Sequence, residues 1–150
     1  MARFRGEFDY SIDAKGRLNI PAKFRRALSP EANETFAICR GPNNCLRAYP
    51  QDGWEKYEDE LEGRPQTHEA LRHLRLLQST LTDSKLDAQG RVSLSAKQID
   101  IAGIKKNVTL VGHKGFIEIW DTETYRDYIG TGEDFDKVFF ESVEVGMRNK

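Results

Sequence analysis

The 150-residue sequence contains few of the residues that build covalent or metal-held scaffolds. It has two cysteines, Cys39 and Cys45, and three histidines. Both cysteines have apolar neighbours, and no nearby histidine completes a tetrahedral metal site, so we expect two free thiols in a hydrophobic core. A disulfide or a two-thiolate metal site is the alternative, although a reducing cytoplasm disfavours the disulfide. We expect no cofactor and no metal.

Long apolar runs are also missing. No run approaches the ~20 residues that a membrane-spanning helix needs. The first ten residues carry Arg3, Arg5, Glu7 and Asp9 in place of the apolar centre of a signal peptide. We therefore expect a cytoplasmic protein without a membrane partner. With 38% hydrophobic residues, a chain of this length is sufficient for a single domain with its own core.

The sequence has no excess of charge of either sign, because its formal net charge is −1. The charges are nevertheless segregated along the chain. Residues 1–28 contain seven basic residues against three acidic ones, whereas 52–63 contain six acidic residues against one basic, and 121–141 seven against two. The near-zero sum therefore conceals a local basic surface that could meet a polyanion.

An internal repeat organises the chain. Residues 13–20 read Asp-Ala-Lys-Gly-Arg-Leu-Asn-Ile and residues 87–94 read Asp-Ala-Gln-Gly-Arg-Val-Ser-Leu, which are identical at four of eight positions. A second pair of similar segments, 45–49 and 116–120, follows in the same order. The chain is therefore interpreted as a duplication of one unit of roughly 45 residues.

Each unit is predicted to contain a β-hairpin, a short helix and two further strands. Apolar residues alternate with polar ones on both sides of the Asp-Ala-Lys-Gly turn, so residues 7–20 are predicted to form a hairpin. Pro21 suits the first turn of the helix that follows. The remaining strands are expected at 36–39 and 45–49 and, in the second unit, near 84–87, 91–94, 107–112 and 115–120.

Helices are predicted between and after the two units, at residues 53–62, 67–81, 121–129 and 134–147. The last of these has Phe135, Val138, Phe139 and Val143 on one face. We expect that face to pack back on the chain or to dock on another subunit.

The sequence offers no catalytic constellation. Asp13 and Asp87 are carboxylates that the repeat makes equivalent, and acid–base chemistry is conceivable for them. Each, however, begins a tight turn before Gly and Arg, where a carboxylate commonly accepts turn N–H groups. His68 and His73 are five residues apart, which is not the spacing of a metal-binding pair on one helix face. We do not expect an enzyme.

The basic residues of the repeat suggest a nucleic-acid contact. Lys15 and Arg17 flank the first turn, and Arg91 holds the matching place in the second. A two-stranded ribbon fits the major groove of B-DNA, where Arg pairs with two acceptors of guanine. Lys23, with Arg25 and Arg26, lies on the next helix and suits phosphates. The alternative is that Asp13–Arg17 and Asp87–Arg91 are ion pairs that only stabilise two turns.

These features are similar to the MraZ family of transcriptional regulators. The two Asp-x-x-Gly-Arg turns, each followed by an aliphatic-x-aliphatic strand, are the most specific part of the resemblance. It extends over roughly residues 4–128 through the segments Phe4-Arg5-Gly6-Glu7, Ile20-Pro21-Ala22-Lys23-Phe24-Arg25, Cys45-Leu46, Tyr49-Pro50, Trp54, Val111-Gly112 and Ile117-Glu118-Ile119-Trp120-Asp121. The chain departs from the family at Ser95, where the second unit usually has a proline, and at 78–80.

The resemblance implies a mixed β and α fold. Two tandem halves of the AbrB/SpoVT swapped-hairpin type, at residues 7–54 and 83–126, would interleave into one β-barrel with pseudo-two-fold symmetry and flanking helices. Residues 127–150 would form a C-terminal helical tail.

The resemblance also implies a function. The protein would be a sequence-specific, nucleoid-associated repressor of the bacterial division and cell-wall gene cluster, binding repeated boxes in double-stranded promoter DNA as a ring-like homo-oligomer. A ring-forming scaffold without specific DNA binding is the alternative. Together with the residue chemistry above, the DNA contacts would be Arg5, Lys15, Arg17, Lys23 and Arg91, and the turns would be shaped by Asp13, Gly16, Asp87 and Gly90.

Overall fold

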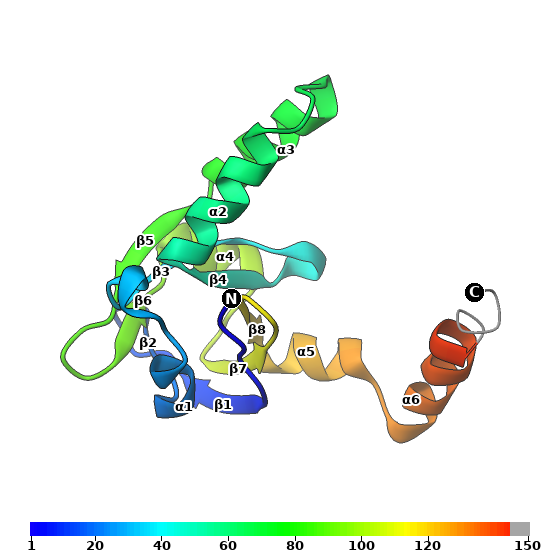
Figure 1. Ribbon diagram of the computed structural model, residues 1–150. Coiled ribbons are helices and arrows are strands. Elements are labelled where there is room, and N and C mark those ends of the chain that lie inside the picture. The colour runs from blue at the N-terminus through cyan, green and yellow to red at the C-terminus, as the bar shows by residue number, and fades with distance from the viewer. Residues whose placement is uncertain (145–150) are drawn as a thin grey trace.

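The computed structural model describes residues 1–144 and contains two antiparallel sheets. Figure 1 shows the larger sheet at the centre of the molecule, with helices extending from it in two directions. Its six strands lie in the order β1 (Glu7–Ser11), β7 (Asn107–Gly112), β8 (Ile117–Asp121), β4 (Leu46–Pro50), β3 (Thr35–Arg40) and β5 (Thr82–Lys85). The smaller sheet is a ribbon of β2 (Arg17–Asn19) and β6 (Arg91–Ser93).

The two halves of the duplication exchange strands. β1 of the first half pairs with β7 of the second, and β5 of the second half pairs with β3 of the first. β2 and β6 pair with each other. The halves are therefore interleaved, so that the two copies of the repeat build one structure.

The hairpin predicted at residues 7–20 is correct only for its turn. Gly16 N donates to the Asp13 carbonyl at 3.0 Å, and Asp13 N donates to the Arg17 carbonyl at 3.1 Å. Beyond this turn β1 and β2 separate, because Leu18 is fully buried opposite Val92 of the other half. Burial of these apolar side chains thus favours pairing between the halves over pairing within one hairpin.

The expected closed barrel is not formed by the strands of residues 1–144. β1 and β5 are the two edges of the larger sheet, and the ribbon packs between them, with β2 beside β1 and β6 beside β5. Ile20 N donates to the Gly90 carbonyl and Leu94 N to the Gly16 carbonyl, so these bonds extend the ribbon and do not join it to either edge. The arrangement is pseudo-symmetric but open.

A single main core lies between the ribbon and the larger sheet. Its members come from both halves, and its fully buried side chains include Leu18, Phe24, Phe36, Ile38, Val92, Leu110, Ile117 and Ile119. Cys39 and Cys45 are buried free thiols, as predicted. The strands and helices around this core confirm the predicted mixed β and α architecture.

Two short helices follow the ribbon strands: α1 (Ala22–Arg26) after β2 and α4 (Ala96–Ala102) after β6. α2 (Gln51–Glu62) and α3 (His68–Gln78) lie side by side and project from the sheet, with Gln78 Nε2 donating to Glu58 Oε2 at 3.0 Å (Figure 1). α5 (Thr122–Ile129) follows β8. Short 3-10 turns lie at Pro30–Ala32 and Pro42–Asn44.

The last helix, α6 (Gly132–Val138), continues into a π-helical segment at Phe139–Glu144. It begins two residues earlier than predicted because Thr131 and Asp134 form a capping box. The predicted end of this helix at residue 147 lies outside the described residues, as do residues 145–150 of the predicted 127–150 tail. None of the helices within 1–144 is long and apolar enough to cross a membrane.

Candidate nucleic-acid interface

The outer face of the β2–β6 ribbon brings together the two arginines of the repeat. Its register pairs Arg17 with Ser93 and Asn19 with Arg91, on either side of the buried Leu18–Val92 pair. Because successive strand residues point to opposite faces, both arginines lie on the face turned away from the core. Residues 74 positions apart in the sequence therefore share one small surface.

Each arginine is held by the aspartate that begins its turn. Asp13 Oδ1 accepts from the backbone N–H groups of Lys15 at 3.0 Å and Arg17 at 2.8 Å, and Oδ2 accepts from Arg17 Nε at 2.6 Å. Asp87 repeats all three bonds with Gln89 N, Arg91 N and Arg91 Nε, each at 2.9 Å. The two turns are thus built identically.

The same bonds lower the pKa of both carboxyl groups below its ordinary value. The backbone N–H of Arg17 is the main cause for the pKa of Asp13, and the backbone N–H of Arg91 is the main cause for that of Asp87; desolvation opposes both. Both aspartates are therefore ionised around neutral pH. The ion pairs Asp13–Arg17 and Asp87–Arg91, which the alternative interpretation of the sequence expected, are therefore present.

These ion pairs leave part of each guanidinium available. The aspartate of each turn engages Nε, and Arg91 Nη1 also lies 3.7 Å from Asp13 Oδ2. Within residues 1–144 the Nη groups of Arg17 have no hydrogen-bond acceptor. The arginine side chains remain 34% and 21% exposed. Each aspartate therefore orients an Arg fork before any ligand arrives, which lowers the entropy lost on binding.

The surroundings of the two arginines differ in charge. In the first half Lys15 lies in the turn and Lys23, Arg25 and Arg26 follow on α1, all exposed. The matching positions of the second half are Gln89, Lys97, Ile99 and Asp100. The two Asp–Arg pairs are neutral in sum, so the positive surface comes from the first half.

Arg25 is a residue of this surface whose structural role the sequence did not reveal. Its Nε donates to the Ile20 carbonyl at 3.0 Å, and its side chain covers Gly90 so closely that a Cβ there would lie 2.8 Å from Arg25 Cζ. Ile99 of α4 covers Gly16 in the equivalent way. The Gly16 turn therefore packs against α4 of the second half, and the Gly90 turn against α1 of the first half. In the sequence, the equivalence of Arg25 and Ile99 in the repeat is the one signal of these contacts.

Gln98 is a second residue that sequence reasoning missed. It is fully buried, and its Nε2 lies within 3.0 Å of the Ile38 and Thr80 carbonyls and of Thr82 Oγ1. It also forms a capping box with Ser95, which replaces the proline cap of α1. The Ser-x-x-Gln spacing could have identified it.

Arg5 is not brought to the ribbon. It is exposed in the N-terminal segment, where Phe4 N donates to the His113 carbonyl and Gly112 N to the Gly6 carbonyl. The five-residue strand β1, ~17 Å long at ~3.4 Å per residue, lies between Arg5 and the Asp13 turn. The predicted contact residues thus divide into a ribbon group with Lys15, Arg17, Lys23 and Arg91, and the separate Arg5.

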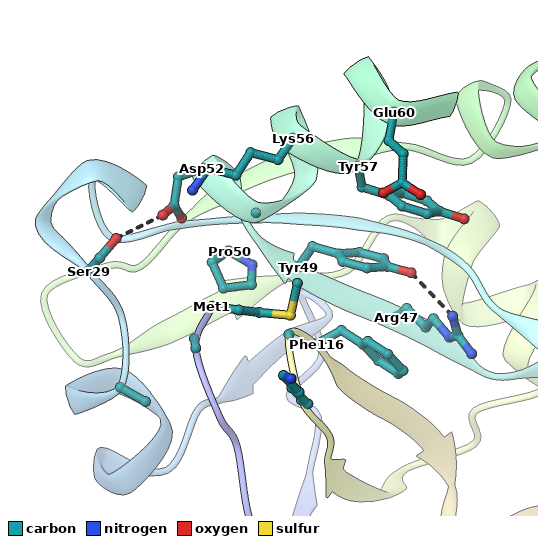
Figure 2. Close-up of a pocket in the computed structure, with 15 residues that line it drawn as sticks. Met1, Ser29, Arg47, Tyr49, Pro50, Asp52, Lys56, Tyr57, Glu60 and Phe116 are labelled. Atoms are coloured by element: carbon teal, nitrogen blue, oxygen red, sulfur yellow. Dashed lines mark hydrogen bonds between the residues drawn. The ribbon is translucent and has the colours of Figure 1, made fainter. Parts of the chain in front are cut away.

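A cavity lies away from these arginines, and Figure 2 shows it between α2, the N-terminus and the turn before β8. Its volume is about 580 Å³. Tyr49 and Tyr57 stack at 5.7 Å, and Arg47 lies over the Phe116 ring at 4.2 Å while donating to the Tyr49 hydroxyl. Its lining contains no histidine or cysteine, and within residues 1–144 no cluster of three acidic, His or Cys side chains could hold a metal.

Comparison with protein families places both halves in one group. The family model described as "MraZ protein, putative antitoxin-like" matches residues 3–76 and 79–141. The matched residues cover nearly the whole chain and extend beyond the segments that carried the resemblance. Proteins of this family are generally transcriptional regulators of the division and cell-wall gene cluster, and they are not enzymes.

Proposed function

This chain belongs to the MraZ family, and we propose that it is a sequence-specific repressor that binds repeated boxes in the promoter of the division and cell-wall gene cluster. It acts in the cytoplasm, associated with the nucleoid. The observation that carries the proposal is the pair of equivalent arginines on the outer face of the β2–β6 ribbon, each oriented by an aspartate.

The roles of the individual residues follow from their positions. Arg17 and Arg91 donate from their Nη groups to guanine O6 and N7 in the major groove. Lys15 and Lys23, on the exposed basic side of the ribbon, bind phosphates and set the position of the protein on the duplex. Arg5, which is separated from the Asp13 turn by the whole of β1, makes a DNA contact separate from those of the ribbon. Asp13, Asp87, Gly16 and Gly90 shape the turns.

Self-association supplies the affinity that one chain of net charge −1 lacks. The pseudo-two-fold of the duplication is used inside one chain, so further contacts between copies need not be two-fold. Head-to-tail contacts close into rings when the rotation allows it. Copies in such a ring present the same ribbon in the same sense, so they bind direct repeats about one helical turn apart, and their weak contacts combine through high effective concentration.

Selection of bound duplexes from a random pool tests the proposal. At ~0.15 M ionic strength, the purified full-length protein is expected to enrich a short box in direct repeats, phased at ~10 bp. Recovery of unrelated sequences in proportion to the input pool would contradict specific DNA binding and favour the scaffold alternative.

Salt dependence separates binding to phosphates from binding to bases. Replacing Lys15 or Lys23 by Ala is expected to reduce the slope of log K against log salt by ~0.9 for each phosphate that a bound copy no longer neutralises. The fall in affinity should be similar for the selected box and for random DNA. A fall confined to the selected box would contradict the phosphate role.

A further inference from the structure

The last helix of the chain exposes an aromatic face. Phe135, Val138 and Phe139 lie on one side of α6 and its continuation, at the i, i+3, i+4 spacing, and are 67%, 58% and 42% exposed. Phe140, next to them, is 57% exposed. Monomeric proteins seldom leave so contiguous an apolar surface uncovered. This surface, defined by these four residues, is the aromatic face of α6.

The aromatic face of α6 is surrounded by negative charge. Glu133, Asp134, Asp136 and Glu141 are exposed, and between Gly132 and Glu144, where the described part of the chain ends, Lys137 is the single cation. A partner that covers the face therefore needs both apolar side chains and cations. That combination is present elsewhere in this chain.

The complementary surface is a groove at the side of α3. Its volume is about 410 Å³, and its lining includes Tyr49, Leu76 and Leu77, together with the cations Arg40 and Arg47 and the imidazole of His73. No acidic side chain lines it. α3 has no fully buried residue, and Leu76 is 52% exposed. We call this surface the α3 groove.

We propose that the aromatic face of α6 of one copy docks on the α3 groove of a second copy. The two surfaces match in apolar character and are opposite in charge. They cannot meet within one chain in this arrangement, because α6 and α3 extend from different sides of the molecule (Figure 1). The contact is heterologous, so it propagates from copy to copy; it rests on the self-association proposed above and identifies its surfaces.

Two complementary variants test this docking. The donor variant Phe135→Ser/Phe139→Ser removes the aromatic face, and the acceptor variant Leu76→Ser/Arg40→Glu changes the α3 groove; all four side chains are exposed, so the fold should be retained. Light scattering coupled to gel filtration of full-length protein is expected to give one-chain mass for each variant, at concentrations where the unchanged protein is assembled. Circular dichroism checks the fold.

Mixing the two variants gives the sharpest result. The donor variant retains an intact groove and the acceptor variant an intact aromatic face, so an equimolar mixture is expected to form dimers and nothing larger. Ile129→Ser, on α5 and 54% exposed, is the matched control and should keep the assembled mass.

The possible failures are distinguishable. Unchanged mass in the donor or acceptor variant would overturn the docking and leave self-association standing. Two folded monomeric variants that do not dimerise on mixing, or an equal loss of assembled mass in Ile129→Ser, would also overturn it. A monomeric unchanged protein would overturn both the docking and the self-association proposed above.

Discussion

At the scale of the residue, one carboxylate in each turn has two consequences. Asp13 closes the turn through backbone N–H groups and fixes the guanidinium of Arg17 through Nε. The ion-pair alternative and the DNA-contact hypothesis therefore do not compete, because Asp13 binds Nε of Arg17 and leaves the Nη groups available for a ligand.

The lowered pKa values of Asp13 and Asp87 predict an acid-dependent loss of stability. A carboxyl group whose pKa is lower in the folded state stabilises the fold above its ordinary pKa of ~4, and this contribution is lost as pH falls through the folded pKa. Asp13→Asn/Asp87→Asn should therefore be less stable than the unchanged protein at neutral pH. Urea unfolding should show the difference shrinking as the pH falls below ~4. A difference that is independent of pH would contradict the electrostatic origin.

The buried thiols of Cys39 and Cys45 are predicted to react slowly with thiol reagents. Burial raises the pKa of both Cys39 and Cys45 to about 12, far above the ordinary value of ~8.5. At mildly alkaline pH a disulfide reagent should label neither thiol in the native protein and both in denaturant. Rapid labelling under native conditions would show that this part of the sheet opens readily.

At the scale of the element, the sequence predicted most strands and helices but not their partners. Alternation and the Asp-Ala-Lys-Gly turn located β1 and β2 correctly. The turn signal is local, whereas the burial of Leu18 against Val92 joins residues 74 positions apart, so no local pattern indicates that β2 pairs with β6. An exchange between the halves was expected from the family resemblance alone. The same limitation explains why two contacts were missed, that of Arg25 with Gly90 and that of Gln98 with the Ile38 carbonyl, since each joins the two halves.

The two turn glycines are predicted to differ in their tolerance of alanine. Gly16 and Gly90 have φ of 76° and 77°, which costs any other residue ~1–2 kcal/mol. A Cβ on Gly16 would also lie 2.8 Å from the Leu94 carbonyl oxygen, whereas one on Gly90 would meet the movable side chain of Arg25. Gly16→Ala should therefore reduce the free energy of unfolding more than Gly90→Ala in urea titrations.

Gly132→Ala is the control for this comparison, since nothing lies within 4 Å of a Cβ at that position. Its free energy of unfolding should change little. Equal reductions at Gly16 and Gly90 would contradict the predicted role of the Leu94 backbone.

At the scale of the whole molecule, the interleaved halves make one folding unit. β1 and β5 are each hydrogen-bonded to the opposite half, and the main core draws on both. Neither half could bury its apolar face alone. The sequence predicted this duplication and exchange through the family resemblance, but the open sheet with a separate ribbon, in place of a closed barrel, required the structure.

Head-to-tail assembly on DNA predicts a dependence on box phasing. Copies related by rotation reach one face of the duplex only when their boxes are separated by about whole helical turns. Inserting ~5 bp between two selected boxes turns the second box to the opposite face. The affinity for the two-box duplex should then fall towards that of a single box, as measured by fluorescence anisotropy. Unchanged affinity would contradict phased binding by neighbouring copies.

The central claim is that Arg17 and Arg91 contact DNA bases, and one measurement tests it most directly: the affinity of Arg17→Ala and Arg91→Ala for the selected box and for random DNA at one salt concentration. Arg64→Ala is the control, because Arg64 also pairs with a carboxylate four residues away, Glu60, but lies beyond the end of α2. We expect the binding free energy on the selected box to weaken by ~1–3 kcal/mol for each arginine replaced, with a much smaller effect on random DNA and unchanged circular dichroism. Full affinity for the selected box in a correctly folded Arg17→Ala/Arg91→Ala protein would contradict the claim.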